Sequence, residues 1–290
     1  MPDGATIGAL LAAATARMKQ ADVAETPRLD AILLLAHVSG LTADRIRIAP
    51  DAPVSPKVAA AFEVLLKRRL AREPVSKILG VREFWSLDFR TGRDVLDPRP
   101  DSETLVAGVL AAVPDRKAAL RLVDFGTGSG CLLLSLLHEL PNATGLGIDI
   151  SPPALAIAQD NADRLGLSAR VTFRRGDWGR GCDGSFDILI SNPPYIESGT
   201  VPQLEPEVAQ YDPVLALDGG PDGLQAYRQL IPDLARLAAP DSLAALEVGM
   251  GQDVAVEQLM AAAGFASIAV LPDLGGIGRV VTGRKSVQIP

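Results

Sequence analysis

Apolar residues recur with a helical period in the amino-terminal part of the chain. The positions that share a spacing of three or four residues in the first such stretch are Ile7, Leu10, Leu11, Ala14 and Met18. This spacing predicts an amphipathic helix. Thr26, as a cap, and Pro27, as a first helical residue, predict a second helix that runs through His37 and stops at Gly40.

A third helix is predicted to begin at Ser55 and Pro56. Its apolar face comprises Val58, Phe62, Leu65 and Leu66. Four basic residues crowd its end: Lys67, Arg68, Arg69 and Arg72. They favour a solvated face stabilised by the helix dipole, and the alternative is a docking surface for an acidic partner. We place the end of this helical domain at residue 73.

Strand patterns follow. Residues 78–89 alternate like a β-hairpin, and residues 74–97 are expected to link the two domains. Ser102 is expected to cap a helix over 103–113. Residues 98–290 then alternate between strands and helices, which predicts an α/β fold. The predicted strands are residues 121–125, 144–149, 171–174, 186–191, 243–248, 268–271 and 279–282.

The first of these strands runs into a glycine-rich turn, Gly126–Gly130. A helix and a second strand follow, and Asp149 closes that strand. Glycine allows positive φ and close approach of the backbone to a ligand, and Asp149 is placed to accept hydrogen bonds from ribose hydroxyls. A dinucleotide fingerprint would have its third glycine at the position of Cys131, so the alternating glycines depart from that fingerprint.

The tetrapeptide Asn192-Pro193-Pro194-Tyr195 follows a buried strand, at the edge where open α/β sheets bind ligands. The two prolines lack N–H groups and stiffen the turn, so its carbonyls face outward beside an asparagine amide. Such a turn fits a planar group with an –NH2, either a side-chain amide or an exocyclic amine. The alternative is a proline-rich surface turn.

Composition narrows the class of protein. The chain has 290 residues and only two cysteines, and so few cysteines indicate a reducing compartment. Its formal charge of −7 disfavours binding to a bare phosphate backbone. No signal peptide or membrane span is predicted, so we expect a cytoplasmic protein. No His/Cys cluster has metal-ligand spacing, and His37 and His138 are expected to be packed or surface residues.

The chain resembles the peptide chain release factor glutamine N5-methyltransferase family, whose members are class I S-adenosylmethionine-dependent methyltransferases. The segments that carry the resemblance are residues 73–89, 98–103, 124–130, 192–195 and 211–224. The resemblance covers nearly the whole chain and implies a Rossmann-like seven-stranded domain behind a small helical domain that docks the substrate. Asp97 stands where the family more often has an apolar residue, and Phe125 where it often has Leu.

The resemblance also implies roles for particular residues. The cofactor-binding residues would be Gly126, Thr127, Gly128, Ser129, Gly130, Asp149, Asp177, Trp178 and Asn192. Asp149 would hold the ribose, and Asp177 and Trp178 would lie near the adenine. The implied catalytic residues are Asn192, Pro193, Pro194 and Tyr195, and these four together with Arg99 would hold the substrate glutamine. For Trp178 the alternative is core packing.

The implied reaction is methylation of the glutamine in a Gly-Gly-Gln motif of release factors, with S-adenosylhomocysteine as the product. The enzyme is expected to be a monomer that binds no nucleic acid or membrane. Three alternatives stay open. One is glutamine methylation of a ribosomal protein, and another is methylation of amino groups of adenine or guanine in nucleic acid, which uses the same tetrapeptide. The third is a non-catalytic adaptor, which would not need loop, acid and turn together.

Overall fold

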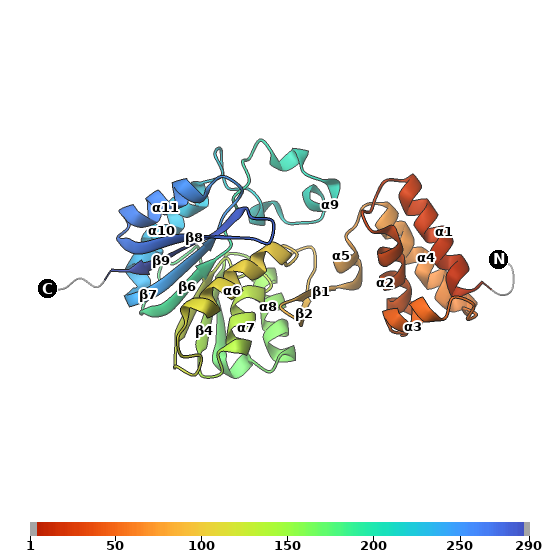
Figure 1. The fold of residues 1–290 in the computed structure, drawn as a ribbon, viewed down its shortest axis with the longest axis horizontal. Coiled ribbons are helices and arrows are strands. Elements are labelled where there is room, and N and C mark those ends of the chain that lie inside the picture. Colours follow the sequence, from red (N-terminus) through yellow and green to blue (C-terminus); the bar gives the residue numbers. More distant parts are fainter. Residues whose placement is uncertain (1–4, 287–290) are drawn as a thin grey trace. The chain divides into compact units, whose positions relative to one another are not determined.

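The computed structural model describes residues 5–286, and the chain divides into two compact units. The first unit comprises the chain up to Gly80 together with the separate segment Pro206–Tyr211, and the second comprises the rest (Figure 1). The chain therefore leaves the first unit at Gly80 and not at the predicted residue 73. The reason is that Val75–Leu79 forms a short helix, α5, which packs on two other helices of the first unit.

The first unit is helical, as predicted. Its helices are α1 (Ile7–Gln20), α2 (Pro27–Ser39), α3 (Ala43–Ile48), α4 (Pro56–Leu70), α5 (Val75–Leu79) and α9 (Pro206–Ala209). The apolar stripe of α1 packs into the core of this unit. Ser55 caps α4 by accepting a hydrogen bond from the Val58 N–H. Thr26 occupies the predicted N-cap position of α2, but its hydroxyl donates to the Asp30 carboxylate and makes no capping hydrogen bond to a backbone N–H.

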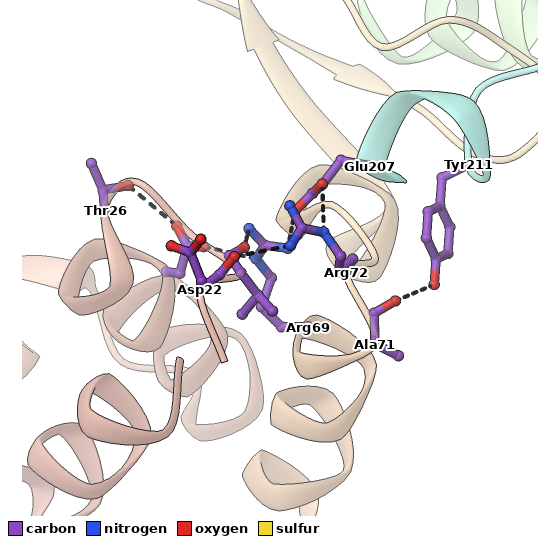
Figure 2. A network of polar contacts seen from close by, with 9 residues as sticks. Asp22, Thr26, Arg69, Ala71, Arg72, Glu207 and Tyr211 are labelled. Carbon is purple, nitrogen blue, oxygen red and sulfur yellow. Dashed lines mark hydrogen bonds and ion pairs between the residues drawn. The ribbon is translucent and has the colours of Figure 1, made fainter. Parts of the chain in front are cut away.

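Ion pairs neutralise the basic end of α4 within the first unit. Arg69 is buried and donates to Asp30 at 2.9 Å and to Glu207 of α9 at 3.2 Å. Arg72 donates to the second Glu207 oxygen at 3.0 Å (Figure 2). The Tyr211 hydroxyl adds a hydrogen bond to a backbone carbonyl at the end of α4. Arg68 likewise pairs with Glu73 at 2.6 Å, so three of the four basic residues have acidic partners inside this unit, while Lys67 is exposed.

The second unit is built on the predicted seven-stranded sheet. Its strands are β3 (Arg121–Phe125), β4 (Thr144–Asp149), β5 (Val171–Arg175), β6 (Phe186–Ser191), β7 (Ala238–Glu247), β8 (Phe265–Pro272) and β9 (Gly278–Lys285). Their order is β5-β4-β3-β6-β7-β9-β8. Neighbouring strands pair in parallel except at β9, which pairs antiparallel with both β7 and β8. The order reverses between β3 and β6, which is where such sheets bind ligands.

Helices cover both faces of the sheet (Figure 1). On one face lie α6 (Glu103–Ala112), α7 (Cys131–Glu139) and α8 (Pro152–Arg164), and on the other lie α10 (Gln225–Leu237) and α11 (Asp253–Ala262). Successive side chains of a strand point to opposite faces of the sheet, so each strand contributes to the hydrophobic core on both sides. Leu122 of β3 packs on the first face and Val123 on the second. This is the α/β architecture expected from the sequence.

The predicted hairpin is present but shifted along the chain. It consists of β1 (Val81–Phe84) and β2 (Leu87–Arg90), which pair antiparallel. Ile78, placed in the hairpin by its alternation, lies in α5 because an αL glycine, Gly80, ends that helix first. No helix within residues 5–286 has the length and hydropathy to cross a bilayer.

Candidate active site

Three loops meet at the carboxyl edge of the sheet. β3 pairs in parallel with β4 on one side and with β6 on the other, so Phe125 lies level with both Ile148 and Ser191. The glycine turn, Asp149 and Asn192 follow these three positions directly. Parallel pairing therefore brings together the residues that the sequence singled out. The Ser191 hydroxyl strengthens this junction by donating to the Phe125 carbonyl at 2.6 Å.

The turn after β3 adopts a conformation that requires glycine. Gly126, Gly128 and Gly130 have φ angles of +71°, +54° and +79°. At Gly130 a Cβ would also lie 3.1 Å from the Leu134 side chain, so this glycine permits close packing of α7 as well. Residues with side chains rarely adopt such φ values, so the alternating glycines are explained by the backbone path.

Asp149 holds the glycine turn by its backbone. One carboxylate oxygen accepts from the Gly128 N–H at 2.8 Å, and the other accepts from the Ser151 N–H at 2.9 Å. Each carboxylate oxygen has a further lone pair, so the ribose contact expected of Asp149 stays compatible with these bonds and stays a prediction.

A second acid, Asp124, is buried beneath the turn. Burial raises the pKa of this carboxyl to about 7, while the hydrogen bond from Thr127 lowers it and the nearby charge of Asp149 raises it. Thr127 donates to one oxygen at 2.7 Å, and the other oxygen has no partner in the described part of the chain. Asp124 therefore supports the turn from inside the protein, and its ionisation lowers the stability of the folded state because the charge is buried.

Trp178 lies beside the glycine turn and packs partly on the core. Its ring carbon Cζ3 is 3.8 Å from where a Cβ of Gly126 would be, and its indole N–H donates to Gln229 at 3.0 Å. The ring also contacts the core of the α10 face, so packing and cofactor contact are compatible. Asp177 is half-exposed and pairs with Arg180 at 2.7 Å.

The first and last side chains of the Asn192-Pro-Pro-Tyr turn contact different residues. Asn192 donates through Nδ2 to the Ser102 hydroxyl at 3.3 Å. This contact also accounts for Ser102, which does not cap α6 as the sequence predicted. Tyr195 instead directs its hydroxyl toward Glu247, 3.5 Å away, and burial raises the pKa of Tyr195 to about 12.

Glycines of residues 211–224 pack against this turn. Backbone hydrogen bonds join Ile196 to Leu217 and Gly219. A Cβ at Gly219 would lie 2.7 Å from the Tyr195 Cα, and one at Gly223 would lie 2.4 Å from the Tyr195 carbonyl oxygen. The segment therefore supports the backbone of the turn, which gives a physical reason for its glycines.

A cavity of about 440 Å³ joins these features. Of the predicted site residues, those that line it are Arg99, Gly126, Thr127, Gly128, Ser129, Asp149, Asp177, Trp178, Asn192 and Pro194. Gly130, Pro193 and Tyr195 are not in its wall, so their predicted ligand contacts stay predictions. Lining residues for which the sequence predicted no ligand contact include Ser102, Ser151, Gln225 and Gln229. Gln225 and Gln229 lie one helical turn apart on α10, a polar pair that pattern analysis passed over.

Arg99 and Asp97 both line the cavity, and a hydrogen bond to another side chain holds each of them in place. Arg99 donates to the buried Asp212 at 2.6 Å while about two-fifths of its side chain stays exposed. Asp97, the departure from the family pattern, is buried and accepts from the Thr91 hydroxyl at 2.6 Å. The acid therefore fits its place through hydrogen bonding. Within residues 5–286 no cluster of three His, Cys, Asp or Glu side chains is arranged to hold a metal.

Two domain families match this chain. Residues 9–80 match the PrmC N-terminal domain, and residues 116–241 match a methyltransferase domain. Among solved structures, the hMettl16 catalytic domain aligns with a TM-score of 0.57 at 15% identity, covering 74% of this chain and 84% of that one. A methyltransferase from Pyrococcus furiosus aligns with a TM-score of 0.53 at 16% identity, covering 76% and 98%. At these identities the two structures confirm the fold alone.

Full-length relatives are far more similar. A release factor glutamine methyltransferase of Rhodospirillum rubrum is 46% identical, with 98% of this chain and 86% of the relative covered. Proteins of the same description from Caulobacter vibrioides and Moorella thermoacetica are 45% and 44% identical, covering 94% and 88% of this chain and 94% and 90% of theirs. The resemblance found in the sequence is thereby confirmed, and this chain belongs to the release factor glutamine methyltransferase family.

Proposed function

We propose that this protein transfers the methyl group of S-adenosylmethionine to the side-chain amide of the glutamine in a Gly-Gly-Gln loop of release factors. The products are N5-methylglutamine and S-adenosylhomocysteine. Beside family membership, one observation carries the proposal: Asn192 lies in the wall of the same cavity as the glycine turn and Asp149. A methyl donor held by the turn and an amide held by Asn192 would therefore share one enclosure.

The residues present fit this cofactor. Gly126 and Gly128 offer backbone without side chains, Asp149 offers a charged acceptor for hydroxyls, and Trp178 offers an aromatic surface. When bound, the sulfonium supplies a strongly electrophilic methyl group. The protein's task is then to hold the acceptor in line with that group and to exclude water.

Asn192 is the residue that we expect to orient the acceptor. An amide nitrogen is a poor nucleophile because its lone pair is delocalised into the carbonyl. Alignment by acceptors at Asn192 Oδ1 and the Pro193 carbonyl would lower the barrier, an effect worth about 7–11 kcal/mol at best. The same acceptors stabilise positive charge as it develops on nitrogen. No strong base is needed, since the methylated amide cation is very acidic.

We assign recognition of the protein substrate to the helical first unit. Every described residue that lines the cavity belongs to the second unit. Arg69 and Arg72 at the end of α4 do not support this assignment, because both form ion pairs with acids of the same unit. If it holds, the wild-type enzyme should show a far lower KM for an intact release factor than for a short Gly-Gly-Gln peptide. Equal KM values would remove the docking role.

The test offers three classes of acceptor to the enzyme with labelled S-adenosylmethionine: purified release factors, ribosomal proteins, and RNA or DNA. The net charge of −7 is unfavourable for a nucleic acid partner, so we expect label in the release factor. A release factor with its glutamine replaced by asparagine is the matched control and should stay unlabelled. Label confined to nucleic acid or to ribosomal proteins would overturn the proposal.

A further inference from the structure

The two ends of the Asn192 side chain have nearly the same shape but opposite hydrogen-bonding character. The role proposed above requires the acceptor oxygen, Oδ1, to face the substrate amide. In the structure Nδ2 donates to the Ser102 hydroxyl at 3.3 Å, which leaves Oδ1 for the cavity side. Ser102 is itself buried, with 2% of its surface exposed.

Ser102 alone does not decide that orientation. A hydroxyl can accept from an amide N–H or donate to an amide oxygen, so Asn192 could turn over if the Ser102 proton pointed toward it. The orientation is therefore fixed only if another acceptor takes the Ser102 proton.

Glu247, at the end of β7, has the properties of that acceptor. Its side chain is buried, and its Oε1 lies 3.5 Å from the Tyr195 hydroxyl. Its Oε2 is buried and has no partner of ordinary hydrogen-bond geometry within residues 5–286. Burial raises the pKa of Glu247 to about 7, while the nearby Ser102 hydroxyl and the charge of Arg279 lower it. The free acceptor and the hydroxyl that needs one are thus neighbours.

A purely structural role does not explain a carboxyl group here. Arg279, whose charge lowers the pKa of Glu247, forms its own ion pairs with Asp273 at 3.1 Å and Asp101 at 3.4 Å. Among the described residues Glu247 therefore has no ion pair of its own, a costly arrangement for a buried carboxyl that an apolar side chain of similar volume would avoid. Such costs are typical of functional sites.

We propose that Glu247 is a positioning residue for methyl transfer. By accepting the protons of Ser102 and Tyr195, it makes Ser102 an acceptor toward Asn192 and so holds Asn192 Oδ1 toward the substrate amide. It also anchors both ends of the Asn-Pro-Pro-Tyr turn through a single group. This inference rests on the proposed function, since it assigns a cause to the orientation that the function requires.

The variant Glu247→Gln tests this directly. Glutamine fills the same volume but has one oxygen in place of two, so it cannot accept both hydroxyls on separate atoms. We expect kcat on the release factor to fall by about tenfold or more, with little change in the KM for cofactor or in Tm. The matched control is Ser242→Ala, because Ser242 is buried on the same strand and its hydroxyl has no hydrogen-bond partner among residues 5–286. That variant should keep wild-type kcat.

Ser102 provides the second arm if Glu247→Gln fails to fold. Ser102→Ala should lower kcat to a similar extent, and Ser102→Thr, which keeps the hydroxyl, should restore most of it. In the double variant the two losses should not multiply, since both break one relay. A kcat within about twofold of wild type for Glu247→Gln or Ser102→Ala, or fully multiplicative losses, would overturn the inference. Wild-type protein that methylates no release factor would instead overturn the proposed function.

Discussion

Arg69 and Glu207 form an ion pair with Nη1 and Oε1 3.2 Å apart, although 138 positions separate them in the sequence. Glu207 lies in α9, within the loop that leaves the Asn192-Pro-Pro-Tyr turn, yet its segment Pro206–Tyr211 belongs to the helical unit (Figure 2). The chain thus returns to the first unit in the middle of the catalytic domain. The ion pair anchors that return.

Glu207→Ala should destabilise the first unit by about 1.5–3 kcal/mol, the range for hydrogen bonds to charged groups. Arg69 keeps Asp30 as a partner, so complete unfolding is not expected. Urea titration measures the change, and limited proteolysis should show faster cleavage near residues 206–211. The control is Asp44→Ala, which removes an exposed ion pair with Arg47 and should cost well under about 1 kcal/mol. Equal effects of the two variants would show that the segment is not anchored by Glu207.

Gly223→Ala should reduce turnover strongly while leaving cofactor affinity nearly unchanged. Its φ is +70°, and a Cβ would meet the Tyr195 carbonyl oxygen, so the turn must shift. Gly251→Ala is the control that introduces backbone strain without a steric clash, because its φ is +80° but nothing lies within 4 Å of its Cβ position. That control should cost about 1 kcal/mol of stability and little activity. Comparable turnover in the two variants would remove the supporting role of Gly223.

The pH dependence of stability should change in Asp124→Asn. The pKa of Asp124 is raised from 3.8 to about 7 in the folded protein, so the native state binds more protons than the unfolded state between these values. Ionisation of Asp124 therefore lowers wild-type stability as pH rises through this window. The asparagine variant lacks that loss, and its stability relative to wild type should rise by about 1 kcal/mol or more between pH 4 and pH 8.

Denaturant titrations across that range, without cofactor, measure the difference. Asp222→Asn is a control of opposite sign, since the pKa of Asp222 is lowered to about 2 by its hydrogen bond to Arg228. The loss of stability in Asp222→Asn should be constant between pH 4 and pH 8 and should shrink only as pH falls below about 4. A stability difference for Asp124→Asn that does not vary with pH would contradict the assigned shift.

Asp149→Ala should weaken S-adenosylmethionine binding by a factor of tens. The change removes the proposed ribose acceptor and also frees the Gly128 and Ser151 N–H groups that set the turn. A hydrogen bond to a charged group is worth about 1.5–3 kcal/mol, which gives the expected factor. Calorimetry measures it, with the half-exposed Asp160, which pairs with Arg90 outside the cavity, as the control position. Unchanged affinity in Asp149→Ala would remove this residue from the cofactor site.

Local pattern was sufficient for the sheet and for the loops that end its strands. Apolar runs mark buried strands, and parallel pairing then forces the Gly126 turn, Asp149 and Asn192 to one edge. Side-chain capping was less predictable. Thr26 and Ser102 have suitable residue types, but Asp30 and Asn192 compete for their hydroxyls in the folded protein.

Relationships between distant segments could not be predicted from the sequence. A basic cluster such as that at the end of α4 looks solvated until its acids are known, and Glu207 has no pattern that links it to Arg69. Glu247 likewise ends an ordinary apolar strand, and only the fold places it next to Ser102 and Tyr195. Tertiary contacts over long sequence separations supply this information, and no local preference encodes it.

The site of methylation in an intact release factor is the decisive measurement. An intact release factor is incubated with S-adenosylmethionine and either wild-type enzyme or Asn192→Ala, and tandem mass spectrometry locates the modification. The account predicts one added methyl group on the Gly-Gly-Gln side chain with wild-type enzyme. With Asn192→Ala it predicts almost none, although calorimetry should show nearly unchanged cofactor affinity. Methylation elsewhere in the release factor, or turnover of Asn192→Ala within about tenfold of wild type, would contradict it.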